Sequence, residues 1–315
     1  MSIISPINDI SPSDDPLTGS LRSTRKPGAF LETEEIQAIL ARSKACLDAG
    51  VAVHLSGPAG IGKTALAVRL AAGLERPMAL LTGHEGLNRK DFVGQQIGHS
   101  EVVVDDKYIQ SVRRRKTQSR IDWRDAMLSD AMRRGHTFIY DEFTRASPRT
   151  NALLLSVLEE GVLVTEGGAE GQGYVRAHPD FRVILTSNPS DYVAVNAAPD
   201  ALLDRMVTFH LDGYSAETES RIVQAASGLD HHISTRVVEI VSQIRTGHAQ
   251  ALLPSMRTSI LIGKLAQHAE AAGELTDERL QTFVSDVVTG RAPEVPESAI
   301  AKAVRATRTE KKGDA

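Results

Sequence analysis

The sequence predicts an α/β fold, in which a parallel sheet flanked by helices is followed by a smaller domain made only of helices. Between residues 51 and 211, short apolar runs typical of buried strands alternate with helical patterns. From Ser215 onward only helical patterns remain, and glycines separate them. Because strand–helix alternation gives a parallel sheet with helices on its faces, we expect a ligand at the carboxyl ends of the strands.

Composition narrows the function classes. The chain has 315 residues, 41% of them hydrophobic, so one large or two modest domains can bury a core. The net charge of −4 argues against a general nucleic-acid-binding role, which favours a basic surface. The single cysteine, Cys46, rules out a disulfide within the chain and suits a reducing cytosol. No apolar run approaches the ~18 residues that span a membrane, so we expect a cytoplasmic protein without membrane contact.

A glycine-rich motif follows the first predicted strand, Val51–Leu55, and precedes a predicted helix, Ala65–Leu74. It fits the phosphate-loop pattern G-x-x-x-x-G-K-[ST] at every fixed position. Its members are Gly57, Pro58, Ala59, Gly60, Ile61, Gly62, Lys63 and Thr64. The glycines let backbone N–H groups face a phosphate, and the helix N-terminus adds positive charge. We expect Lys63 to reach the β- and γ-phosphates and the Thr64 hydroxyl to hold Mg²⁺.

Two carboxylates end another buried run, Thr137–Tyr140. Asp141 is the predicted ligand of Mg²⁺, bound through water, and Glu142 is the predicted base that deprotonates the attacking water. The alternative for this pair is a solvated acidic turn. A further strand, Phe181–Ser187, ends in Asn188-Pro189, and Asn188 is predicted to contact the γ-phosphate or the attacking water. Its alternative is a plain Asn-Pro turn.

Together these residues predict a site that binds and hydrolyses ATP with Mg²⁺. We therefore expect four segments: a disordered arm over 1–26, an α/β nucleotide-binding domain over 27–212, a helical lid over 213–306 and a flexible tail over 307–315. Helices are expected at about 36–49, 65–74, 121–134, from Ser147 or Pro148, and at 216–227, 233–245, 256–272, 277–289 and 297–303. A hairpin is expected at 161–176, a strand at 206–211 and a loop at 83–99, and Trp123 is expected in the core.

The order of these motifs resembles an AAA+ ATPase, and Asp141–Ala146 together with the hairpin resembles its MoxR branch. Further segments resemble the GvpN family of gas vesicle proteins over about Phe30–Ala266. These segments are Phe30–Thr33, Val53–Gly60, Asp91–Gly94, Tyr140–Arg145, Leu154–Glu160, His178–Arg182 and Ala201–Met206.

The resemblance implies roles that the residues alone do not. Arg205 matches the arginine that reaches the ATP of a neighbouring subunit, and its alternative is an ion pair with Asp204. Arg145 is a second candidate for that contact. Arg257 matches the lid arginine called sensor 2, which touches the γ-phosphate. A shared site implies a ring of this chain, with a hexamer expected.

The same resemblance implies an ATP-driven, chaperone-like remodeller in gas vesicle assembly, with shell or accessory proteins as partners. It would act in the cytoplasm, with attachment to gas vesicles left open. The run Arg113–Lys116 is more basic than the family pattern suggests. The main alternative is a MoxR-type activator of a metalloenzyme or of Rubisco. A nucleic-acid motor or restriction-type GTPase subunit, and a structural protein with a silent nucleotide site, are further alternatives.

Overall fold

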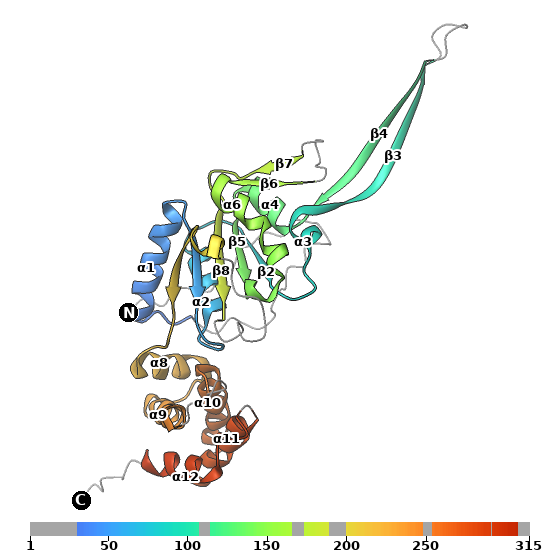
Figure 1. Cartoon of the computed structure of the whole chain (residues 1–315). Helices are drawn as coiled ribbons and strands as arrows, with labels where there is room; N and C mark the ends of the chain where they lie inside the picture. The colour runs from blue at the N-terminus through green and yellow to red at the C-terminus, as the bar shows by residue number, and fades with distance from the viewer. Residues whose placement is uncertain are drawn as a thin grey trace, which may run out of the picture. The chain divides into compact units, whose positions relative to one another are not determined.

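The computed structural model describes residues 30–106, 114–165, 173–188, 200–247, 254–290 and 292–307, without the side chains of 96–106 and 114–123. The predicted arm over 1–26 lies outside these residues. The predicted tail over 307–315 also lies outside them except for Thr307, which is buried and hydrogen-bonded to α12. The chain forms two compact units (Figure 1). One comprises residues 36–213, and the other the described residues among 1–35 and 214–315.

A five-stranded sheet forms the centre of the first unit, with the strand order β2-β5-β8-β1-β9 and all neighbours parallel. Its strands are β1 (Ala52–Ser56), β2 (Met78–Thr82), β5 (Thr137–Asp141), β8 (Arg182–Ser187) and β9 (Met206–His210). Every residue of β1 and β5 is buried, which explains why these strands are continuous apolar runs in the sequence. The predicted α/β fold with a parallel sheet is confirmed.

The strand register brings the predicted site residues to one edge of the sheet. Ser56 at the end of β1 lies opposite Ser187 at the end of β8, and Tyr140 of β5 lies opposite Leu185 of β8. The segments that follow these three strands therefore leave the sheet at neighbouring points. They carry the phosphate loop, the acidic pair and Asn188.

Helices precede, connect and flank the strands of this unit. They are α1 (Glu34–Asp48), α2 (Lys63–Ala72), α3 (Arg89–Val93), α4 (Met127–Arg134), the 3₁₀ turn η1 (Phe143–Arg145), α5 (Pro148–Asn151), α6 (Leu153–Glu160) and α7 (Asp200–Leu203). The predicted helix start at Ser147 or Pro148 is confirmed, because the Ser147 side chain caps α5 by accepting a hydrogen bond from the Thr150 N–H.

A long antiparallel ribbon, β3 (Gly94–Asp106) and β4 (Arg114–Asp125), corrects two predictions (Figure 1). The helix predicted over 121–134 begins only at Met127, because residues 121–125 pair with β3. Trp123 therefore belongs to a strand, opposite Gln96, and its predicted place in the core concerns a side chain outside those that the structure describes. The predicted loop over 83–99 contains α3 and the start of β3. For residues 121–125, pairing with a strand that lies far away in the sequence overrides the local helical pattern. The basic run Arg113–Lys116 lies outside the residues whose side chains are described.

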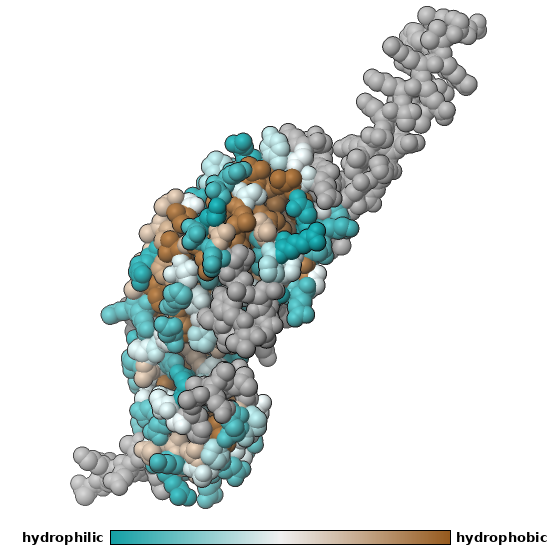
Figure 2. All heavy atoms as spheres, viewed as in Figure 1, coloured by the Kyte–Doolittle hydropathy of each residue, from teal (hydrophilic) through white to brown (hydrophobic). Residues whose placement is uncertain are grey.

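A second, shorter hairpin is confirmed, with β6 (Val162–Val164) antiparallel to β7 (Tyr174–Arg176). The glycine-rich segment between them, 166–172, lies outside the described residues. Val164 and Tyr174 face each other across the two strands and remain about half exposed. Figure 2 shows apolar surface on the α/β unit in the region of these strands.

Four aromatic side chains form the centre of the core in this unit. Phe92, Phe138, Tyr140 and Phe143 are fully buried, and Tyr140 contacts each of the other three rings. Two of these residues flank the acidic pair, Tyr140 before it and Phe143 after it. The core therefore fixes the backbone that carries Asp141 and Glu142.

The second unit contains helices and no strand among its described residues. Its helices are α8 (Ala216–Ser227), α9 (His231–Gly247), α10 (Met256–Ala271), α11 (Asp277–Thr289) and α12 (Glu297–Ala306). They pack around their own apolar core, which includes Val237, Ile240, Ile262 and Val284. The predicted all-helical region is confirmed, with boundaries that shift by a few residues. Within the described part of the chain, no helix is long and apolar enough to cross a bilayer.

Candidate functional site at the carboxyl edge of the sheet

The phosphate loop lies between β1 and α2, as the motif predicts. Gly62 has a left-handed backbone, with φ of 94°, and directly precedes the first turn of α2. Gly57 serves a different purpose, because a Cβ there would lie 2.4 Å from the carbonyl oxygen of Leu211. Only glycine allows the start of the loop to pass this close to the end of the neighbouring strand. The loop therefore owes its shape to glycine at both ends.

Lys63 is directed into this loop. Its side chain is buried, and Nζ donates hydrogen bonds to the carbonyl oxygens of Gly57, at 2.7 Å, and Pro58, at 2.9 Å. A buried ammonium group beside the N-terminus of α2 places positive charge where a phosphate would bind. Thr64, the next residue, directs its hydroxyl to the acidic pair instead.

The carboxylate of Asp141 is held by two hydroxyl groups. Thr64 Oγ1 lies 2.8 and 2.9 Å from the two carboxylate oxygens, and Thr186 Oγ1 donates to Oδ1 at 2.6 Å. Thr186 also accepts a hydrogen bond from the backbone N–H of Glu142, at 2.9 Å. One threonine of β8 thus fixes both members of the acidic pair. The pair is an ordered, hydrogen-bonded element rather than a solvated acidic turn.

Glu142 has a strained backbone and a charged partner. Its φ of 52° is left-handed, which costs a non-glycine residue about 1–3 kcal/mol and is found most often at functional sites. Gly83 makes room for it, since a Cβ on Gly83 would lie 2.2 Å from the Glu142 carbonyl oxygen. The carboxylate of Glu142 forms an ion pair with Arg145 Nε, at 2.8 Å. Arg145 therefore contacts the acidic pair of its own chain.

The turn after the acidic pair is braced from inside. Asn151 accepts a hydrogen bond from the Tyr140 hydroxyl at 3.0 Å and donates one to the Phe143 carbonyl at 2.9 Å. Burial raises the pKa of Tyr140 above its ordinary value, so the phenol stays protonated and able to donate. These contacts hold η1, and with it the backbone of Glu142, against the core.

Asn188 lies where the sequence predicts, directly after β8, and its side chain is buried. The preceding residue connects it to the phosphate loop, because the Ser187 carbonyl accepts a hydrogen bond from the Gly57 N–H at 3.3 Å. The structure therefore brings Lys63, Thr64, Asp141, Glu142 and Asn188 to one edge of the sheet.

Arg205 lies elsewhere. It directly precedes β9, and because the strands are parallel it belongs to the amino edge of the sheet, away from the acidic pair. Its guanidinium forms two hydrogen bonds to a single oxygen of Glu159 in α6, at 2.6 and 2.9 Å. The partner is thus Glu159 and not Asp204, which was the alternative that the sequence suggested.

Arg257, the predicted lid arginine, is the second residue of α10 and is exposed. The Ser255 N–H donates a hydrogen bond to Thr258 Oγ1 at 3.2 Å, and the Thr258 N–H donates one to the Ser255 carbonyl at 2.8 Å. The helix therefore begins at a defined point directly before Arg257.

Sequence reasoning missed Thr186 and Gly83. A usable pattern exists for the first, since Thr186-Ser187-Asn188 is a polar end on an otherwise apolar buried strand. Buried hydroxyl groups need partners, and the edge that holds the acidic pair offers them. Nothing in the sequence around Gly83 indicates that a carbonyl oxygen from the neighbouring strand would approach it.

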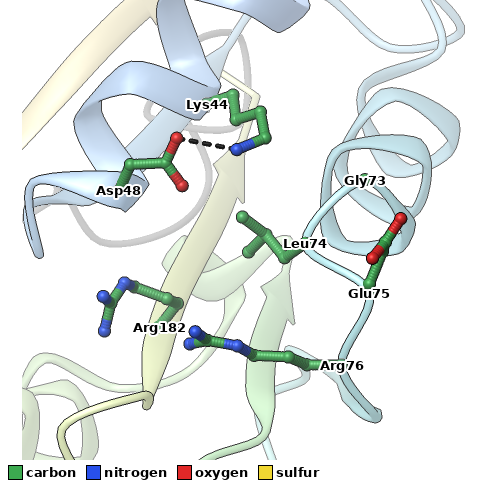
Figure 3. A pocket seen from close by; sticks show the side chains of 7 residues that line it. All are labelled: Lys44, Asp48, Gly73, Leu74, Glu75, Arg76 and Arg182. Atoms are coloured by element: carbon green, nitrogen blue, oxygen red, sulfur yellow. Dashed lines mark hydrogen bonds and ion pairs between the residues drawn. The ribbon is translucent and has the colours of Figure 1, made fainter.

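A pocket of about 390 Å³ lies at the opposite, amino edge of the sheet (Figure 3). Three cationic side chains line it, but each is already engaged. Lys44 pairs with Asp48 at 2.7 Å, Arg76 pairs with Asp180 at 2.9 Å, and Arg182 donates to backbone carbonyl groups. The residues that line the pocket include no phosphate-binding loop, and all three of their cationic side chains already have partners. We therefore do not place the nucleotide there.

Comparison with known proteins identifies the family of the α/β unit. The family model for an AAA domain of the dynein-related subfamily matches residues 52–206, which run from β1 to the start of β9. The gas vesicle ATPase GvpN of Ancylobacter aquaticus is 35% identical over 274 residues, which cover 87% of this chain and 77% of that protein. Protein CbbQ of Hydrogenophilus thermoluteolus is 24% identical, over 67% of this chain and 72% of the other.

Among solved structures, a point mutant of RuvB from Thermotoga maritima matches with a TM-score of 0.54 and 16% identity, over 82% of this chain and 71% of that one. At this identity the likeness concerns the fold alone, and it agrees with the predicted AAA+ architecture. The extent of the match to GvpN is decisive for the family. The chain belongs to the GvpN family of gas vesicle ATPases.

Proposed function

We propose that this chain binds ATP with Mg²⁺ at the carboxyl edge of the sheet, hydrolyses it, and uses the energy as a chaperone-like remodeller in gas vesicle assembly. The observation that carries the catalytic part is the hydrogen-bonded group of Thr64, Asp141, Thr186 and the Glu142 backbone beside the buried Lys63. This group, with the Glu142 side chain, offers candidates for the phosphate-binding cation, the Mg²⁺ ligands and the base.

The oxygen atoms of Thr64 and Asp141 fit a Mg²⁺ ion, which prefers hydroxyl, carboxylate and phosphate oxygens. Such an ion would neutralise charge on the phosphates. Lys63 would exchange its loop carbonyl groups for the β- and γ-phosphate oxygens. Glu142 would accept a proton from the attacking water, and Asn188 would orient that water or the γ-phosphate through its amide.

The position of Arg205 supports a site completed between subunits. An arginine at the amino edge of its own sheet lies away from its own proposed ATP site, which fits a role toward the ATP of another copy. We therefore propose a ring, with a hexamer expected, in which Arg205 leaves Glu159 and contacts the γ-phosphate bound to the neighbouring subunit. Arg145 lies beside Glu142 at the proposed site of its own chain, whereas Arg205 lies at the opposite edge, so Arg205 is the stronger candidate for this contact. We propose the sensor 2 role for Arg257 by resemblance.

The gas vesicle role follows from the family and is tested in a host that carries a complete gas vesicle gene set without this chain. Cells would receive the wild type, Glu142→Gln or no chain, and pressure-collapsible turbidity would be recorded at matched protein levels. We expect normal turbidity only with the wild type. Equal turbidity in all three cultures would refute the role, and the activation of a metalloenzyme or of Rubisco would become the leading hypothesis.

A further inference from the structure

A buried histidine in the strand before the phosphate loop has no part in the proposed chemistry. His54, in the middle of β1, is 1% exposed. Its Nε2 lies 2.8 Å from Ser187 Oγ on β8, and its Nδ1 lies 3.0 Å from Thr208 Oγ1 on β9. The ring also meets the edge of Phe143, directly after the acidic pair, with centroids 5.4 Å apart. One side chain thus connects three strands and the turn that follows a fourth.

The imidazole is suited to a fixed, neutral role. Burial lowers the pKa of His54 to about 4, with His210 as a second cause, so the ring is uncharged at neutral pH. A neutral imidazole has one donor and one acceptor nitrogen. Both partners are hydroxyl groups that can donate or accept, so either tautomer satisfies both contacts.

The contact with Ser187 is the important one, because Ser187 directly precedes Asn188. The hydroxyl of Ser187 contacts His54, and its carbonyl accepts a hydrogen bond from Gly57, the first residue of the phosphate loop. Two independent contacts therefore fix the residue from which Asn188 extends. Loss of the first would remove the side-chain contact of Ser187 and leave the contact of its backbone carbonyl.

We propose that His54 is a positioning residue for Asn188, which acts by holding the Ser187 hydroxyl and so fixing the backbone that carries the Asn188 amide. This inference rests on the proposed role of Asn188 in hydrolysis. A displacement of a catalytic group by a fraction of an ångström to 1 Å lowers the rate of a reaction without preventing substrate binding.

A matched pair of substitutions tests the proposal on the purified full chain. In His54→Gln the amide lies near the position of Nε2 and keeps a partner for Ser187. In His54→Asn the amide lies near Nδ1, so the partner of Thr208 is kept and that of Ser187 is lost. We expect His54→Asn to lower kcat for ATP roughly tenfold, the size expected for one buried hydrogen bond, with KM changed less than about threefold.

We expect His54→Gln to keep kcat within about threefold of the wild type, since its Ser187 contact survives. Ser187→Ala should lower kcat as much as His54→Asn does. The variant that combines Ser187→Ala with His54→Asn should show no further loss of kcat, because both substitutions remove the same contact. Thr208→Val should change the melting temperature but not kcat. A purely structural role for His54 would lower stability in both histidine variants alike and leave kcat unchanged.

Two results would overturn the inference: Ser187→Ala with wild-type kcat, or His54→Gln as slow as His54→Asn. The Ser187→Ala variant keeps the test open even if His54→Asn does not fold. Asn188→Ala separates this failure from that of the proposed function. If Asn188→Ala turns over ATP at the wild-type rate, the role of Asn188 itself is wrong. If it is slow while Ser187→Ala is not, only the inference on His54 fails.

Discussion

The two edges of the central sheet both carry charged side chains, but these side chains differ in their burial and in their partners. At the amino edge, Arg76, Arg182 and Arg205 pair with carboxylates or backbone carbonyl groups at or near the surface. At the carboxyl edge, Lys63 is buried in a glycine loop, and Asp141 is buried between two threonine hydroxyl groups. Positive charge alone therefore does not distinguish the proposed nucleotide site from the opposite edge. Backbone shape and burial do.

The arginines of the amino edge also differ from one another in the partners that they hold. Arg182 donates to several carbonyl groups at the end of α1 and before β8, so it holds two segments together. Arg205 instead holds one oxygen of Glu159, a carboxylate that is 57% exposed, besides the Ala201 carbonyl. An exposed ion pair contributes at most about 1 kcal/mol, so Arg205 can exchange this partner at small cost.

Replacing Arg205 should have the largest effect on turnover. If this arginine serves a neighbouring ATP, Arg205→Ala should lower kcat by roughly 10³–10⁵ while ATP binding is kept. ATP turnover should be measured at a protein concentration where the wild type is assembled. Glu159→Ala is the matched control, since it removes the same ion pair and keeps the arginine. Equal losses in the two variants would mean that the ion pair matters rather than contact with ATP.

Replacing Lys63 should act on binding. Lys63→Ala removes the buried cation at the centre of the loop, and we expect affinity for ATP to fall by roughly 10² or more, since charge-assisted contacts to phosphate are the strong ones. Titration with a fluorescent ATP analogue would measure it. Retained affinity would place the nucleotide elsewhere, and the pocket at the amino edge would have to be reconsidered.

The buried histidine near the carboxyl edge should also contribute to the pH dependence of stability. The pKa of His54 in the folded chain, about 4, lies below the ordinary 6.5, so the unfolded chain binds more protons between these values. Its contribution is fully present above about pH 6.5 and is lost as the pH falls toward 4. From pH 7 to 4, the wild type should lose about 3 kcal/mol more unfolding free energy than His54→Gln. Parallel urea denaturation curves at each pH would measure this, and identical pH profiles would contradict it.

The smallest effect is expected from the pocket at the amino edge. Arg76 forms an exposed ion pair with Asp180 and a hydrogen bond to its carbonyl oxygen. Arg76→Ala should lower the unfolding free energy by about 1 kcal/mol or less and leave kcat and KM for ATP unchanged. Thermal unfolding and a turnover assay would check this. A tenfold loss of turnover would show that the two edges are not functionally distinct.

Sequence patterns predicted the elements whose chemistry is local. The phosphate loop, the strands that end in Asp141 and Ser187, and the helix cap at Ser147 each depend on neighbouring residues. The long ribbon was not predicted, because the pairing of residues 121–125 with β3 depends on contacts between residues 22 (His99 and Ile121) to 31 (Gly94 and Asp125) positions apart. The role of Gly83 and the pairing of Arg205 with Glu159 were not predicted either, because both depend on residues far away in the sequence. Thr186 was hidden because its importance depends on the adjacent strand that carries Asp141.

The central proposal is that ATP is hydrolysed at the carboxyl edge of the sheet. ATP binding and turnover by the Glu142→Gln variant test it most directly. The backbone of Glu142 is left-handed, and its N–H donates a hydrogen bond to Thr186 Oγ1. Both features fit a base that is held in place for one proton transfer. The substitution keeps the shape of the side chain and removes its basicity. We expect ATP affinity within about threefold of the wild type and turnover lower by roughly 10²–10⁴. Turnover close to that of the wild type would contradict the assignment of Glu142 as the base, and with it the account of this edge as the site of hydrolysis.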